Sequence, residues 1–196
     1  GSSFKADGVF GSDDHLFAKA VFFYDDVKDF IAPKGWFEPT TPPTVYYSSQ
    51  NVGHVVRKGI ELSGTYAAGQ FSTSVSYGLL HAVDKETNER MNGITPQSAN
   101  LKLAYAFPAQ AINVWYRAHW SKGGESSVED RATGKNLHFS SFLTHSLGAE
   151  WSPKVADLAN LQAGIAVVNL FDKEYRMLNG SYGSGRGVRL WLSAQF

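Results

Sequence analysis

The sequence predicts an all-β protein, and three observations lead to this fold class. Apolar residues alternate with polar ones at a period of two along most of the chain, which is the pattern of half-buried strands. Aromatic residues make up 14% of the 196 residues and there are 19 glycines, a balance typical of strands joined by tight turns. Helical periodicity is weak, since only residues 154–160, after Pro153, suit a short helix.

The strands in the first half of the chain show the alternation clearly. Ile60, Leu62 and Tyr66 fall on one face of their strand, opposite Arg57 and Glu61. The next strand sets apolar and aromatic residues against serines, and the one after it sets leucines against Lys102 and alanines. The predicted strands up to this point cover residues 4–10, 16–31, 57–66, 71–79 and 101–107.

The second half continues the pattern to the last residue. Val114 and Tyr116 oppose Trp115 and Arg117, and the final strand places alternate apolar residues on one face up to Phe196. The predicted strands here cover residues 112–120, 146–151, 161–169 and 188–196. The chain therefore contains about nine strands, several of them near the ~10 residues that cross a membrane.

The connections between these strands alternate between short and long. The short ones lie at residues 12–14, 68–70, 108–110 and 154–160, and the long, polar ones at 33–50, 82–97, 122–142 and 172–185. A soluble sandwich has no reason to keep this alternation, whereas an outer-membrane barrel has tight periplasmic turns and long outer loops. The sequence therefore favours an antiparallel up-and-down transmembrane β-barrel over a soluble sandwich that binds carbohydrate through Trp36 or Tyr182.

The two faces of the strands differ as a membrane barrel requires. The apolar faces carry aromatic residues near their ends, where an interfacial girdle lies: Tyr66, Phe107, Trp120, Trp151 and Phe196. The opposite faces carry charges of both signs that suit a hydrated lumen: Lys5, Asp7, Lys19, Glu61, Arg117, Glu150 and Arg189.

Composition and motifs exclude several other classes of function. With 18 basic and 18 acidic residues the net charge is zero, so no nucleic-acid partner is expected. The absence of cysteine removes disulfides and thiolate chemistry, and metal-ligand and hydrolase motifs are missing. We therefore expect no enzyme, no catalytic residues and no intrinsic cofactor, with the metal question left open.

Four stretches resemble the C-terminal half of the barrel of TonB-dependent outer-membrane receptors. They are AVFFYDDVKDFI at 20–31, KGIELSGTY at 58–66, VNLFDKEY at 168–175, which is the most specific, and GRGVRLWLSAQF at 185–196. The sequence lacks the plug domain and TonB box of such receptors and has about nine of their roughly 22 strands. Ala194 also stands where the family usually has Tyr. Residues 1–196 are therefore interpreted as the C-terminal part of such a barrel.

The resemblance implies import of a scarce ligand across the Gram-negative outer membrane. Haem, free or taken from a haem-carrying protein, is favoured by the segments 20–31 and 58–66, and the ligand would be transported rather than held as a cofactor. A ferric-siderophore or cobalamin receptor, or a small stand-alone barrel, are the alternatives. The implied partners are the TonB–ExbB–ExbD complex through the missing N-terminal region, the lipid bilayer with lipopolysaccharide, and the barrel-assembly machinery through the strand ending at Phe196.

Candidate ligand contacts are aromatic, cationic and histidine side chains in the long loops or facing the lumen. Haem iron takes His or Tyr ligands, and aromatic rings and cations suit the rest of such a ligand. Tyr and Trp near strand ends also serve as interface anchors, which is the competing interpretation. The candidates are Trp36, Tyr46, Tyr47, His81, His119, Arg131, His138, Tyr182 and Arg186.

Overall fold

The computed structural model of this protein describes residues 1–38, 44–154 and 160–195. Within these ranges the backbone forms eleven strands and one short 3-10 helix, η1 (Pro108–Gln110). The strands of the first half are β1 (Ser2–Asp7), β2 (Asp14–Glu38), β3 (Thr44–Ala68), β4 (Phe71–Asp84), β5 (Gln97–Phe107) and β6 (Ile112–Ser121). Those of the second half are β7 (Gly124–Asp130), β8 (Lys135–Phe139), β9 (Phe142–Trp151), β10 (Asn160–Val168) and β11 (Gly187–Gln195).

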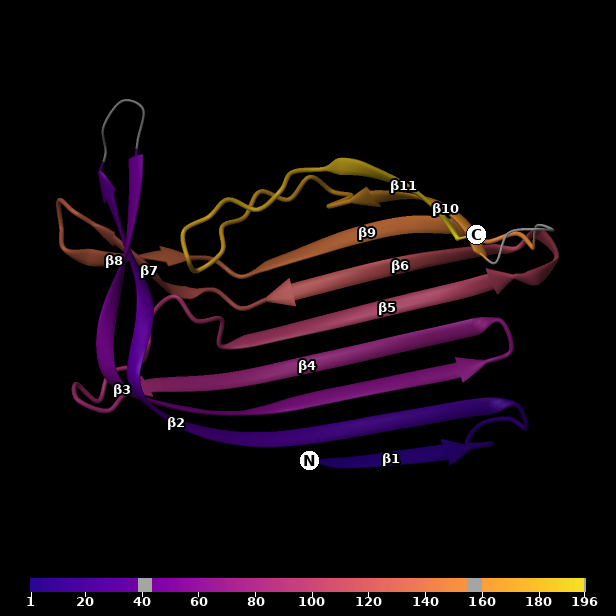
Figure 1. Ribbon diagram of the computed structural model, residues 1–196, viewed down its shortest axis with the longest axis horizontal. Coiled ribbons are helices and arrows are strands. Elements are labelled where there is room, and N and C mark those ends of the chain that lie inside the picture. The colour runs from indigo at the N-terminus through magenta and orange to yellow at the C-terminus, as the bar shows by residue number, and fades with distance from the viewer. Residues whose placement is uncertain (39–43, 155–159, 196) are drawn as a thin grey trace.

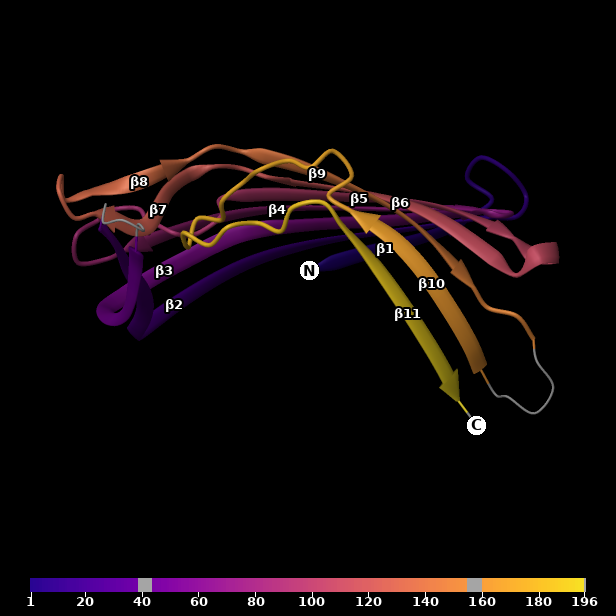
Figure 2. The ribbon, with the colours of Figure 1, turned by 90° about the horizontal axis from the view of Figure 1, so that it is seen from above.

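All the strands except β7 and β8 form one antiparallel meander (Figure 1). β1 to β6 pair in chain order, β9 pairs with β6, and β10 and β11 complete the sheet, while β7 and β8 lie in the connection between β6 and β9. Leaving out β7 and β8, nine of the eleven strands make the wall, which confirms the all-β class and the number of wall strands. The sheet is open and bowed, with β10 and β11 turned out of the plane of the central strands (Figure 2). No helix among the described residues is long and apolar enough to cross a membrane.

The wall has one apolar and one polar face, as the alternation predicts. The register runs without a shift from β3 to β9, so each residue's face is fixed by its partner. On the apolar face Phe22 is 68% exposed and Leu190 is 75% exposed. This arrangement suits a wall whose apolar side chains meet lipid rather than a core.

The polar face is held by hydrogen bonds and ion pairs between neighbouring strands. Arg57 on β3 pairs with Asp25 on β2 at 3.0 Å. Asn100 on β5 donates to Ser76 on β4 at 3.1 Å, and its side-chain oxygen lies 2.8 Å from Nδ1 of His119 on β6. A polar ladder of this kind needs water or polar partners around it. The hydrated lumen of a barrel provides such surroundings.

Two tryptophans cover glycines on the polar face of the last wall strands. Trp115 on β6 lies over Gly148 on β9, and Trp191 on β11 lies over Gly164 on β10. Trp115 is buried in a cluster with Ala104 and Ala166, against which Trp191 packs. The absence of a side chain at the two glycines is what lets the indole rings lie flat against the sheet.

Two of the predicted loops are wrong in part. The sequence predicts a long polar loop at residues 33–50, but β2 and β3 stay paired out to Glu38 and Thr44 as a hairpin that leaves the wall (Figure 1). Its Pro-, Gly- and Ser-rich sequence lacks the alternation of a membrane strand because neither face meets lipid. The loop 122–142 contains the hairpin β7–β8. The predicted turn at 154–160 lies largely outside the described residues, and so does Phe196.

The turn between β1 and β2 closes around the carboxylate of Asp14, which is buried. Its oxygens accept the N–H groups of Val9 and Phe10 at 2.7 Å and of Gly11 at 3.0 Å, and the hydroxyl of Tyr66 at 3.1 Å. Burial alone would raise the pKa of Asp14, but the N–H donors of Phe10 and Val9 and the other hydrogen bonds outweigh it, so its pKa lies below the ordinary value.

Replacing this carboxylate, as in Asp14→Asn, is expected to lower the stability of the barrel at neutral pH. Because the pKa of Asp14 is depressed in the fold, ionised Asp14 stabilises the protein above its ordinary pKa of 3.8, and this contribution is lost as pH falls through the folded-state pKa. Urea unfolding midpoints of the wild type and the variant should therefore converge in acid. A gap that stays constant with pH would show that the shape of the side chain, and not its charge, closes the turn.

Candidate functional site

The long loops at one end of the wall pack against each other around Val128 on β7. Val128 is fully buried, and Gly35 on β2 and Gly180 in the β10–β11 loop both lie against its Cγ2 methyl group. β7 also pairs in parallel with the outer part of β2, and the N–H of Ser127 donates to the carbonyl of Leu178 at 3.0 Å. Loops from three connections thus share one small core.

Asn169 organises the loop that follows β10. Its side-chain N–H groups donate to the carbonyls of Lys173 at 2.9 Å and Ser184 at 3.0 Å, and its side-chain oxygen accepts the N–H of Lys173 at 2.9 Å. Asp172, three residues on, accepts the N–H of Arg186 at 2.7 Å. Asn169 and Asp172 both have positive φ, 49° and 52°, a conformation that Asn and Asp tolerate better than most residues. The segment 168–175 is therefore a loop clamp at the end of the wall.

A pocket of about 710 Å³ lies between this loop and the segment that joins β8 to β9. Aromatic rings form much of it: Phe142 stacks on Tyr175 with ring centroids 4.1 Å apart. The guanidinium of Arg176 lies 3.9 Å from the ring centroid of Tyr182 and 5.6 Å from that of Phe139. The lining residues are His138, Phe139, Ser140, Ser141, Phe142, Asp172, Lys173, Glu174, Tyr175, Arg176, Tyr182, Gly183 and Gly185.

The polar groups at this pocket are of both signs and remain accessible. Nδ1 of His138 lies 3.0 Å from a carboxylate oxygen of Glu125, and both side chains are exposed. Tyr182 is 73% exposed, and its hydroxyl accepts a hydrogen bond from Arg176. The pocket thus offers flat apolar surface, cations, and imidazole and phenol groups. No group of three or more metal-ligating side chains occurs within the part of the chain that the structure describes.

Gly183 holds the Tyr175 ring in this pocket, because a Cβ at Gly183 would overlap that ring. We expect Gly183→Val to push Tyr175 off Phe142 and to change the shape of the pocket while leaving the wall strands paired. Near-ultraviolet circular dichroism, which reports aromatic packing, should change, and the unfolding midpoint should move little. Gly187→Val, at the start of β11 and outside the pocket lining, is the matched control, since the nearest atom to a Cβ there is Cγ2 of Val168 at 3.6 Å, an ordinary contact. An equal spectral change in both variants would contradict the assignment to Tyr175.

The structure brings some of the predicted site residues together. His138 and Tyr182 line the pocket, and Arg186 borders it through its N–H bond to Asp172. His119, on the polar face of β6, lies below the pocket with its ring centroid 5.8 Å from that of Phe142. The ligand-binding role of these residues stays a prediction.

Other predicted residues lie elsewhere. Trp36 and Tyr46 stack on each other across the β2–β3 hairpin with centroids 5.5 Å apart, and Arg131 pairs with Glu38 at the end of β2. Tyr47, from the same hairpin, lies close to Gly180. A Cβ added to Gly180 would be 3.3 Å from the Tyr47 hydroxyl. These four residues therefore belong to the protruding hairpin and its contacts rather than to the pocket.

His81 lies on the apolar face, away from the lumen. It pairs with Lys58 on β3, which pairs with the outward-facing Tyr24 on β2. His81 follows Tyr77 and Leu79 at a period of two, so the alternation in the sequence already places His81 on the apolar face.

Three other pocket residues, Phe139, Phe142 and Arg176, are not marked by any pattern in the sequence. Phe142 and Phe139 belong to a segment whose apolar residues do not alternate, and Arg176 has significance only through the two rings it lies against. The sequence feature that could have indicated Arg176 is its position between Tyr175 and Tyr182 in one loop.

Comparisons with known proteins agree with this architecture. A family model described as "TonB dependent receptor-like, beta-barrel" matches residues 3–170. Relatives include the Heme/hemopexin utilization protein C of Haemophilus influenzae, 24% identical over 94% of this chain and 26% of that protein. The TonB-dependent heme receptor A of Haemophilus ducreyi is 24% identical over the whole chain and 29% of that protein. The chain thus spans roughly a quarter to three tenths of the length of these relatives.

Solved structures show the same fold. The FrpB iron transporter from Neisseria meningitidis has a TM-score of 0.64 and 20% identity, covering 91% of this chain and 29% of that one. The ferripyoverdine receptor of the outer membrane of Pseudomonas aeruginosa has a TM-score of 0.61 and 16% identity, covering 94% of this chain and 25% of that one. This is a family of receptors and transporters in the outer membrane of Gram-negative bacteria. With the family model matching most of its length, the chain belongs to the TonB-dependent receptor β-barrel family.

Proposed function

We propose that residues 1–196 form the C-terminal part of a roughly 22-stranded outer-membrane receptor that imports haem. The observation that carries the proposal is the outer pocket, where His138, Tyr182 and Arg176 stand among aromatic rings. The names of the relatives, a heme/hemopexin utilization protein and a TonB-dependent heme receptor, support the choice of haem.

The chemistry of the pocket suits this ligand. Haem is a flat, largely apolar macrocycle with carboxylates at one edge, and its iron takes His or Tyr as axial ligands. The rings of Tyr175, Phe142 and Phe139 can cover the macrocycle, and Arg176 or Lys173 can pair with its carboxylates. A hydroxamate or catecholate siderophore is bulkier and would use the cations more than the flat surface.

The polar face beneath the pocket would form one side of the transport path. His119 and the Asn100–Ser76 ladder line this face below the pocket, with Lys102 and Arg117 next to them. The face is hydrophilic and offers no covalent chemistry, which suits passage of an intact ligand. Movement itself would depend on a plug coupled to the TonB–ExbB–ExbD complex.

The remaining partners follow from the same assignment. The barrel-assembly machinery would recognise the last wall strand, β11, and lipid with lipopolysaccharide would surround the apolar face. A haem-carrying protein would dock on the outer loops, where the β2–β3 hairpin bends away from the wall (Figure 1).

Haem titration of the complete receptor that carries these residues tests the proposal. The purified protein in detergent should give a saturable Soret absorbance change, and a strain with this receptor as its only haem uptake route should grow on haem as iron source. Tyr182→Phe and His138→Gln should each weaken binding, with His81→Gln on the apolar face as the matched control. Saturable binding of a ferric siderophore or cobalamin without a haem response would replace haem by that ligand.

A further inference from the structure

The polar face of the wall contains a groove of about 390 Å³ that is formed by β3, β4, β5 and β6. Hydroxyl and amide groups line much of it: Ser63, Thr65, Ser74, Ser76 and Asn100. Two cations, Lys102 and Arg117, complete its polar lining. The groove shares no residue with the outer pocket, so the two are separate sites.

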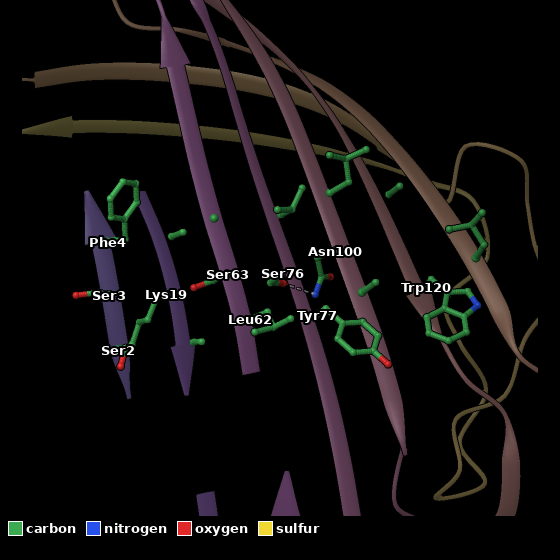
Figure 3. Close-up of a pocket in the computed structure, with 18 residues that line it drawn as sticks. Ser2, Ser3, Phe4, Lys19, Leu62, Ser63, Ser76, Tyr77, Asn100 and Trp120 are labelled. Atoms are coloured by element: carbon green, nitrogen blue, oxygen red, sulfur yellow. Dashed lines mark hydrogen bonds between the residues drawn. The ribbon is translucent and has the colours of Figure 1, made fainter. Parts of the chain in front are cut away.

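The groove lies on the lumen side, because its polar residues are cross-strand partners in one register. One row of partners joins β3, β4, β5 and β6: Thr65, Ser74, Lys102 and Arg117. The next row toward the outer loops holds Ser63, Ser76 and Asn100, and Figure 3 shows the bond between the last two as a dashed line. The close-up is centred on the hollow in the opposite, apolar face of the same strands.

The groove lies farther from the outer loops than the pocket does. β6 runs toward these loops, and His119 near its outer end lies below the pocket. Arg117 comes two residues before His119, or about 7 Å farther into the lumen. A ligand that leaves the outer pocket along this face therefore meets Lys102 and Arg117 next.

Lys102 and Arg117 are like charges directly opposite each other. They are partners on β5 and β6, an arrangement that destabilises a sheet, and an anion bound between them would remove the repulsion. Among the described residues, neither side chain forms an ion pair or a hydrogen bond with another residue. The guanidinium of Arg117 lies 5.2 Å from the ring centroid of Trp115, which helps to hold it in place. Arg117 is exposed and Lys102 is half-buried, so both can reach a ligand in the lumen.

The surroundings of this pair are rich in cations and poor in acids. Three successive rows of the polar face, centred on the row of Lys102, contain these lysines and arginines: Lys5, Lys19, Lys102, Arg117 and Arg189. The one acid of these rows within the described ranges, Asp7, lies 2.6 Å from Nδ1 of His15. Glu61 and Glu150 are each about 14 Å along a strand from the row of Lys102, beyond the Debye length of about 8 Å. The middle of the lumen wall is therefore electropositive, although the chain carries no net charge.

We propose that Lys102 and Arg117 form an inner site that binds the carboxylates of the transported ligand during its passage. The inference rests on the proposed function, since haem carries carboxylates at one edge. A guanidinium binds a carboxylate through two parallel N–H groups, the ammonium adds a point charge, and the serine and threonine hydroxyls can donate to the remaining lone pairs. No aromatic ring is among the described lining residues, so the site would hold the ligand by its charged edge and not by its flat surface.

Uptake of haem by the complete receptor tests this site. In a strain with this receptor as its only haem uptake route, Lys102→Gln/Arg117→Gln should lower the maximal uptake rate at saturating haem about tenfold or more. Soret titration of the same variant in detergent should give the wild-type affinity, because the outer pocket is unchanged. Lys58→Gln/Arg90→Gln, which removes one lysine and one arginine outside the polar face, is the matched control and should transport like the wild type.

Haem dimethyl ester, whose carboxylates are blocked, identifies the group that the two cations bind. The wild type should take up the diester as slowly as the double variant takes up haem, and the double variant should not distinguish the two compounds. Unchanged haem uptake by the double variant would overturn the proposal. A loss of the same factor for haem and for the diester would also overturn it, because the cations would then act on something other than the ligand's carboxylates.

Stability without ligand separates the ligand's carboxylate from one supplied by the receptor's own plug. If the site is empty before the ligand arrives, Lys102→Gln removes a repulsion, and the urea unfolding midpoint should stay the same or rise slightly. A lower midpoint would show that an acidic side chain of the receptor already occupies the site, which contradicts the proposal. A receptor without a Soret response to haem contradicts the proposed function itself, whereas normal haem binding with equal uptake by all variants contradicts only the inner site.

Discussion

Gly164→Val should prevent the last wall strands from packing. A Cβ at Gly164 would overlap the indole ring of Trp191, and the ring could move away only by giving up its packing against Trp115 and its cluster. Overpacking of this kind typically costs about 1–3 kcal/mol. Refolding into lipid vesicles, followed by the heat-dependent electrophoretic mobility of the folded barrel, should show a large loss of folded protein.

Two further variants test whether the overlap with Trp191 causes the loss of folding. Gly78→Val places the same side chain on the polar face of β4, where the nearest atom to the new Cβ is the hydroxyl of Ser98 at 3.6 Å, so it should fold. Adding Trp191→Ala to Gly164→Val should restore part of the lost folding, since the clash is removed. If the double variant is as impaired as the sum of the single ones, the ring and the glycine are not coupled.

Asn169→Ala should have the largest effect on the outer pocket. It removes three hydrogen bonds, worth about 1 kcal/mol each, and places Ala at a positive φ that costs a further ~1 kcal/mol. The loop from 170 to 185 should open, and the haem affinity proposed above should fall at least tenfold. Hydrogen exchange of that loop and haem titration measure the two effects.

Asn169→Gly separates the two causes, because glycine accepts the positive φ but makes none of the side-chain bonds. It should restore the backbone contribution only and leave most of the loop exchange fast. If Asn169→Gly behaves as the wild type, the hydrogen bonds of Asn169 are not what closes the loop. The wall should stay folded in both variants, since Asn169 lies beyond the last pair of β10 and β11, Val168 with Gly187.

The wall could be predicted from the sequence because lipid and lumen impose opposite polarity on successive residues. Strands such as β5 and β6 carry that alternation almost without interruption. The outer half of the β2–β3 hairpin and the hairpin β7–β8 carry none, because both lie beyond the wall, and sequence periodicity has no reason to mark them. Pairing with backbone that is distant in the sequence determines the structure of these segments, and no local sequence pattern indicates that pairing.

The site was predictable only in its types of residue. His138 and Tyr182 stand 44 positions apart in the sequence and become neighbours of one pocket through the packing of two loops. Arg176 gains its place from Tyr182 and Phe139, a contact that spacing does not reveal. His81 is the opposite case, since counting from Tyr77 by twos already directs it outward.

The small core around Val128 has a consequence for the thermodynamics of capture. Loops that are separately mobile lose conformational entropy when they close on a ligand, and this loss weakens binding. Here β7, the β2–β3 hairpin and the β10–β11 loop are already held together through buried contacts and backbone bonds. Most of that entropy is therefore lost during folding, so a ligand that fits the pocket meets a preorganised surface and its association is governed by shape rather than by loop ordering.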